Sequence, residues 1–122
     1  MAGNGRGEMR LELSQEEYLK RFKKILDEMY ELTKIKNDDY AEVDNALSNI
    51  TFSEEVGLPA EWGIIARMGD KYKRIGNILI RKKGESSVKD EQIRETIMDN
   101  AVYSIILMII CDLRLEKMKL LS

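Results

Sequence analysis

One stretch of this sequence gathers cations around a single carboxylate. Arg67, Asp70, Lys71 and Arg74 follow one another at steps of three and four residues, a spacing that brings side chains to one face of a helix. Guanidinium and ammonium groups hold phosphate through charge-assisted hydrogen bonds, and a carboxylate among them positions an arginine or helps to bind a metal. The alternative is a solvated helix face with weak intrahelical ion pairs.

A second stretch supplies carboxylates. Glu91, Glu95 and Asp99 recur every four residues, with Tyr103 one further turn along. Acidic side chains on facing helices are how a protein without histidine holds Mg²⁺, which prefers oxygen ligands and keeps waters for substrate phosphates.

Asp99 stands at the mouth of the apolar run from Ala101 to Cys111, so we expect it to be partly buried. A partly buried carboxylate needs a partner, which can be an arginine, a hydroxyl or a hard cation. The structural alternative to a metal site is a salt bridge from Asp99 to Arg67 or Arg74.

A third stretch, Lys36 to Tyr40, offers a cation, an amide, two carboxylates and a phenol where an amphipathic pattern ends. The plainer interpretation is that Lys36 complements a helix C-terminus and that Asn37 with Asp38 makes the turn.

The three stretches together predict a nucleotide pocket gripped by side chains. No glycine-rich loop follows a strand, which excludes a P-loop or Rossmann site. The metal ligands would be Asp39, Asp70, Glu95 and Asp99, of which the last three would also serve catalysis. The phosphate-binding cations would be Lys36, Arg67, Lys71 and Arg74, and the aromatic side chains for stacking on a base Tyr40, Trp62 and Tyr103.

Composition narrows the chemistry further. The chain has 122 residues, no histidine, one cysteine and a formal net charge of −2, which excludes His-dependent catalysis and His-ligated zinc or haem. The charge argues against a general nucleic-acid or anionic-membrane binder. Cys111 has no partner for an internal disulfide, no secretory signal is visible, and the apolar run is far short of the ~20 residues that span a bilayer. We therefore expect a cytoplasmic protein.

The sequence predicts that helices position these residues. Residues 1–12 are expected to form a mobile arm and 13–122 a single domain. Ser14 and Glu17 form a capping box at the start of the first helix, whose apolar stripe is expected to pack on one side. That stripe comprises Tyr18, Phe22, Ile25, Met29 and Leu32.

Pro59 suits the first turn of a second helix, from about Ala60 to Lys82. Its predicted apolar stripe is Trp62, Ile65, Met68, Tyr72, Ile75 and Leu79. Three glycines interrupt this helix, at 63, 69 and 76, so something must approach closely there. Between the two helices, from Asn37 to Leu58, we expect a candidate functional segment with short helical turns around 41–48 and 53–56.

Ser87 and Asp90 start a third helix, from about Val88 to Met118. It is apolar all round between Ala101 and Cys111 apart from Ser104, as in a helix surrounded by protein. The prediction is an all-α bundle of three long helices, completed by a homodimer or higher oligomer whose interface includes this segment.

These residues also carry a resemblance. The order Lys36-Asn37-x-Asp39-Tyr40, Leu47-Ser48-Asn49, Ser53-Glu54-Glu55-x-Gly57-x-Pro59, Arg67-Met68-x-Asp70-Lys71-x-x-Arg74 and Glu95-x-x-x-Asp99-x-Ala101-x-Tyr103 resembles nucleotide modification associated domain 1, a family of bacteriophages and bacteria. It adds Asn49 to the expected substrate-binding residues and covers roughly Leu32 to Leu107.

The resemblance implies an all-helical protein of phage nucleotide metabolism, distantly similar to the MazG-like all-α nucleoside triphosphate pyrophosphatases. Those relatives hold Mg²⁺ with acidic residues from two helices and direct water at the α-phosphate. The MazG pattern pairs Glu-x-x-Glu with Glu-x-x-Asp, whereas this chain has Glu54-Glu55 and Glu95-x-x-x-Asp99. Three functions stay open: a Mg²⁺-dependent nucleotide pyrophosphohydrolase, a nucleotide-binding protein without catalysis, and a helical interaction module.

Overall fold

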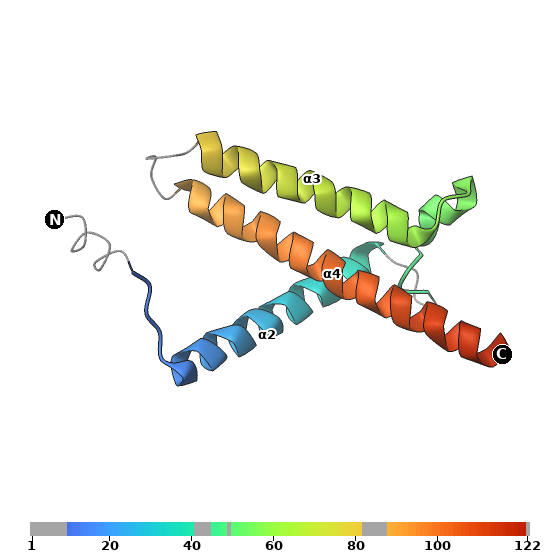
Figure 1. The fold of residues 1–122 in the computed structure, drawn as a ribbon, viewed down its shortest axis with the longest axis horizontal. Coiled ribbons are helices and arrows are strands. Elements are labelled where there is room, and N and C mark those ends of the chain that lie inside the picture. Colours follow the sequence, from blue (N-terminus) through green and yellow to red (C-terminus); the bar gives the residue numbers. More distant parts are fainter. Residues whose placement is uncertain (1–9, 41–44, 49, 82–87, 122) are drawn as a thin grey trace. The chain divides into compact units, whose positions relative to one another are not determined.

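The computed structural model describes residues 10–40, 45–48, 50–81 and 88–121, without the side chains of 39–40, 81 and 88–91. Its elements are α2 (Gln15–Tyr40), the short 3₁₀ helix η1 (Thr51–Val56), α3 (Ala60–Arg81) and α4 (Val88–Leu121), as Figure 1 shows. None of the described residues forms a β-strand. The predicted all-α fold with three long helices is confirmed.

The chain divides into two units, Met1–Leu32 and Thr33–Ser122, and α2 contributes to both. In the first unit, Ser14 caps the helix as predicted, since its Oγ accepts a hydrogen bond from the N–H of Glu17 at 3.1 Å. The Glu17 carboxylate accepts from Nε of Arg21 at 3.2 Å. The start of the first helix was therefore predicted correctly.

The apolar stripe of the first unit is largely uncovered. Met29 is buried, but the other four members of the stripe are 42–52% exposed. The first unit by itself therefore does not provide the packing that was expected on this side of the helix.

The end of α2 also differs from the prediction. The turn expected at Asn37 and Asp38 is absent, because α2 continues through both residues to Tyr40. Asn and Asp are weak helix formers that cost less than about 0.7 kcal/mol each in a helix, and neither Gly nor Pro stops the helix before Tyr40.

The connection to α3 is built from turns. The N–H of Ser48 donates to the carbonyl of Asn45, and the short helix predicted at 53–56 is found as η1. Gly57 ends η1 with φ 86°, a left-handed conformation that glycine adopts without strain. Of the other predicted turn, residues 41–44 lie outside the described residues.

In the second unit, α3 and α4 run antiparallel side by side (Figure 1). Ala60, Ile64 and Ile110 form the fully buried core between them. Half-buried side chains pack around this core: Leu47, Ile50, Met68, Tyr103, Ile106 and Leu107.

The predicted close approach at the glycines of α3 holds at one of three positions. A Cβ on Gly63 would lie 3.3 Å from Oγ of Ser53, so η1 packs tightly on α3 there. At Gly69 and Gly76 the described chain brings nothing within 4 Å of such a Cβ.

The buried face of α3 is not the predicted one. Ala60, Ile64 and Ile78 are buried, whereas Trp62, Ile65, Tyr72 and Leu79 are 55–67% exposed. Only Met68 and Ile75 of the predicted stripe are half-buried. This helix carries two apolar stripes, and periodicity alone does not say which one meets α4.

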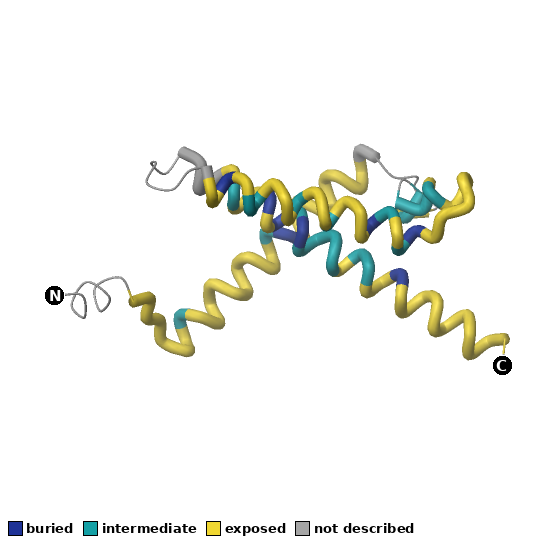
Figure 2. The backbone as a smooth tube through the Cα atoms, turned by 45° about the horizontal axis from the view of Figure 1, so that its top comes forward, coloured by how far each residue is buried: buried dark blue, intermediate teal, exposed yellow. Residues whose placement is uncertain are grey.

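The middle of α4 is partly covered and its last third is exposed (Figure 2). Within the run predicted to be surrounded by protein, Ile110 is buried, but Ile105, Met108 and Ile109 are 40–63% exposed. The complete enclosure expected for this run was wrong for the single chain. By length and composition alone, the stretch Gln92–Leu121 would suffice to cross a membrane, a test that the core helix of a soluble protein also passes.

Candidate functional site

Three of the predicted site residues meet on α4. Nζ of Lys71, from the middle of α3, lies 3.0 Å from Oδ2 of Asp99, and Nζ of Lys36, near the end of α2, lies 3.4 Å from Oδ1. The three residues, all from the second unit, are called the Asp99 cluster below. Each carboxylate oxygen thus has its own ammonium partner.

The Asp99 cluster is partly withdrawn from water. The side chains of Lys71 and Asp99 are 22% and 33% exposed, whereas that of Lys36 is 62% exposed. Burial alone raises the pKa of the Asp99 carboxyl, but the hydrogen bond from Lys71 and the charges of both lysines outweigh it and hold that pKa below its ordinary value. Asp99 is therefore ionised at neutral pH.

The predicted partial burial of Asp99 and its need for a partner are confirmed, but the predicted partners were wrong. Asp99 pairs with two lysines and not with Arg67 or Arg74. The antiparallel register of α3 on α4 sets Lys71 opposite Asp99. The arginines lie one turn to either side of Lys71 along α3.

The remaining members of the cationic stretch are open to solvent. Arg67, Asp70 and Arg74 are exposed and form no ion pair with any residue that the structure describes, so the alternative of intrahelical pairs is not found. The Asp99 cluster carries one net positive charge, from two lysines and one carboxylate. Arg67 and Arg74 raise this to three, and Asp70 lowers it to two.

The other predicted site residues are more scattered. Glu95 is exposed one turn before Asp99, and Tyr103 is half-buried against the core. Trp62 is nine residues before Lys71, about two and a half turns, so it projects from the other side of α3. Asn49 and the side chains of Asp39 and Tyr40 lie outside the described residues.

The described carboxylates do not suit Mg²⁺. No group of three or more acidic or cysteine side chains comes together among the residues that the structure describes. Both oxygens of Asp99 already face ammonium groups, which repel a further cation. The Asp99 cluster offers two ammonium groups against one carboxylate, and no step through a metal follows from it.

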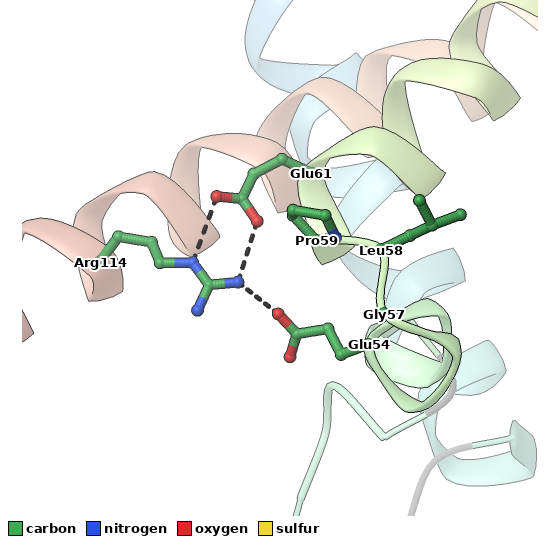
Figure 3. Close-up of a pocket in the computed structure, with 6 residues that line it drawn as sticks. All are labelled: Glu54, Gly57, Leu58, Pro59, Glu61 and Arg114. Carbon is green, nitrogen blue, oxygen red and sulfur yellow. Dashed lines mark hydrogen bonds and ion pairs between the residues drawn. The ribbon is translucent and has the colours of Figure 1, made fainter.

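A second charged cluster, not predicted from the sequence, lies further along α4. Arg114 donates from Nη2 to Glu54 of η1 and from Nε and Nη2 to Glu61 of α3, the latter at 3.2 and 3.0 Å (Figure 3). These three residues are called the Arg114 cluster. They line a surface hollow of about 460 Å³ together with Gly57, Leu58 and Pro59.

The Arg114 cluster is balanced towards negative charge. The hydrogen bond from Arg114 lowers the pKa of both Glu54 and Glu61, and the two carboxylates raise the pKa of the guanidinium. One cation faces two carboxylates, so the hollow repels phosphate despite its size. Nothing in the spacing of residues 54, 61 and 114 signals this cluster, because only the packing of α4 on α3 and η1 brings them together.

Comparisons with known proteins leave the resemblance as an expectation. No protein-family model, no curated protein and no solved structure matches this chain.

Proposed function

We propose that this protein binds the phosphate groups of a nucleotide at the Asp99 cluster. The observation that carries the proposal is a half-buried lysine, Lys71, held 3.0 Å from a carboxylate that it shares with Lys36. Asp99 keeps two ammonium groups close together in a fixed place. Their mutual repulsion is relieved further when a phosphate adds negative charge.

The flanking arginines support the same proposal. Arg67 and Arg74 project one turn to either side of Lys71 and have no partner among the described residues. Planar guanidinium groups bind phosphate oxygens in a bidentate manner, so two of them along one helix fit a polyphosphate better than a single inorganic phosphate. A nucleoside di- or triphosphate is the ligand class that this spacing favours.

The Mg²⁺-dependent pyrophosphohydrolase implied by the resemblance is a further step, which the described donor set does not support. Asp70 and Glu95 are exposed on neighbouring helices. For hydrolysis, such carboxylates would have to bind one metal ion together with further ligands from outside the described residues. The proposal is therefore a cytoplasmic nucleotide-binding protein, with hydrolysis as an outcome that the first experiment detects.

The experiment measures binding and turnover together. Stoichiometric protein is mixed with ribo- and deoxyribonucleoside triphosphates, with Mg²⁺ or with EDTA, and the free and heat-released nucleotides are chromatographed. Recovery of unchanged nucleotide from the bound fraction in EDTA is expected. Release of monophosphate and pyrophosphate only with Mg²⁺ would establish the hydrolase instead.

A matched pair of variants assigns the site. Lys71→Met keeps the length of the side chain but removes its charge, and the loss of one charge-assisted hydrogen bond is expected to weaken binding about 10- to 100-fold. Lys117→Met, an exposed lysine on the last third of α4, is the control and should bind as the wild type does. Equal affinity in the two variants would refute the assignment of phosphate to the Asp99 cluster. If the wild type binds no nucleotide at all, the nucleotide-binding proposal fails, and the helical interaction module becomes the favoured function.

A further inference from the structure

We infer that a second copy of this chain docks on the exposed apolar face of α3, antiparallel and related by a two-fold axis. The α3 apolar face consists of Trp62, Ile65, Tyr72, Leu79 and Ile80, which are 55–77% exposed. It lies on the other side of the helix from Lys71, so the inference is independent of the nucleotide proposal.

The exposed area suits a specific dimer. The five side chains leave roughly 600 Å² of apolar surface open per chain, so a symmetric pair would bury about 1,200 Å², the lower limit for stable protein interfaces. The largest apolar patch of a typical monomer measures about 300–600 Å² and is often functional, so this face lies at the upper end of that range. Because the same patch exists on every copy, a two-fold pairing covers both and leaves no open end.

The glycines of α3 give the pairing its register. Gly69 and Gly76 lie on this face, with nothing in the described chain within 4 Å of a Cβ at either position. When two copies of α3 pair antiparallel around the point between residues 72 and 73, Gly69 of one chain lies opposite Gly76 of the other. Backbones approach most closely where side chains are missing, so the two glycine pairs would seat the large side chains around them.

The interface expected from the sequence, on α4, is less suitable. Ile105, Met108 and Ile109 are exposed there, but Asp112 follows directly on the same side of the helix, and most other residues of the run are half-buried within the chain. Among the described residues, the side of α3 that carries the apolar face also holds Lys73 and, five turns before Leu79, Glu61, whose charge is paired with Arg114.

Two matched isoleucines test this choice. Ile65 on α3 and Ile109 on α4 are 55% and 45% exposed, so a charge at either position leaves the folded chain intact. At a protein concentration of about 50 µM, light scattering is expected to give the mass of a dimer for the wild type. Ile65→Glu is expected to be a monomer with unchanged helical circular dichroism, and Ile109→Glu to remain a dimer.

Cross-linking tests the register. In a Cys111→Ser background, Lys73→Cys places a thiol next to the two-fold axis, whereas Asn77→Cys places it on the same helix but about 13 Å from its symmetry mate along the axis. Oxidation is expected to link Lys73→Cys chains into covalent dimers and to leave Asn77→Cys chains unlinked, since disulfides need Cα atoms within about 7 Å.

Each result decides the inference. A monomeric wild type overturns it, as does a dimer that Ile109→Glu dissociates and Ile65→Glu does not. A dimer that depends on Ile65 but fails to cross-link at residue 73 overturns the antiparallel register. None of these outcomes alters the nucleotide assay with Lys71→Met, so the two proposals fail separately.

Discussion

The two charged clusters on α4 are opposite in design. In the Asp99 cluster one carboxylate lies between two lysines, and in the Arg114 cluster one guanidinium lies between two glutamates. Both join α4 to α3 and to one further element. The sequence separation between them is 15 residues on α4, from Asp99 to Arg114, so they fasten different parts of the same pair of helices.

The difference lies in what each cluster leaves unpaired. The Arg114 cluster has a negative net charge, and its Arg114, Glu54 and Glu61 side chains are 43%, 41% and 26% exposed. The Asp99 cluster has a similar overall exposure, because its Lys36 side chain is 62% exposed. Its net charge, however, is positive, and two arginines without partners among the described residues flank it. The two salt-bridge clusters therefore differ in net charge, which is why the phosphate site is proposed at the Asp99 cluster and not at the Arg114 cluster.

The largest loss of stability is expected from a substitution in the core between α3 and α4, because this core supports both clusters. Ile64 is 1% exposed and belongs to the core between α3 and α4. Ile64→Ala should lower the free energy of unfolding by about 2–5 kcal/mol, and both clusters should be lost together. Chemical denaturation measures this, with the half-exposed Ile97→Ala as control, which should change stability by less than about 0.5 kcal/mol.

Removing the central residue of each cluster separates them. Asp99→Leu leaves two lysines facing each other in a partly buried site and is expected to cost about 1–2 kcal/mol. Arg114→Met leaves Glu54 and Glu61, which water reaches, and should lower the stability less than Asp99→Leu does. Thermal melts of the two variants compare them directly. Equal or reversed losses would mean that the Arg114 cluster is the stronger clamp.

The comparison is sharpened by neutralising one carboxylate in each cluster. Asp99→Asn removes a negative charge next to the proposed phosphate, and at about 4 Å in water this is worth about 1 kcal/mol, or roughly fivefold tighter binding. Glu61→Gln should not change affinity. Calorimetric titration with a nucleoside triphosphate in EDTA measures both, and the same affinity change in Glu61→Gln as in Asp99→Asn would contradict the anion site.

The smallest effect is expected from pH. The pKa values of Asp99, Glu54 and Glu61 are lowered in the folded chain, so the unfolded chain takes up protons first as the pH falls. Their stabilisation is complete above the ordinary values of 3.8 for Asp and 4.5 for Glu and is lost as the pH falls through the lower folded values. Melting temperatures between pH 6 and pH 3 should fall less steeply for Arg114→Met than for the wild type.

Local signals predicted the helices well. Ser14 and Pro59 mark helix starts through backbone hydrogen bonding and fixed φ, which depend on near neighbours only. The helix end at Tyr40 was missed because Asn37 and Asp38 weaken a helix without stopping it.

The candidate site was predicted only in part, because local spacing identifies residues on one helix but not their partners on another. The four-residue spacing identified Asp99 and Lys71, but the pairing of Asp99 depends on the register between elements 28 and 63 residues apart in the sequence. Arg114 was overlooked for the same reason. The buried face of α3 was also misjudged, since Trp62 and Ile64 are both apolar and only their packing partner distinguishes them.

The exposure of Trp62 gives the protein a built-in optical reporter. It is the single tryptophan of the chain and, at 67% exposed, should emit as a solvated indole when the chain is alone. Docking of a second copy on the α3 apolar face would exclude water from the ring and shift its emission to shorter wavelength. The emission wavelength of Trp62, followed while unlabelled protein is diluted, would then report the self-association equilibrium.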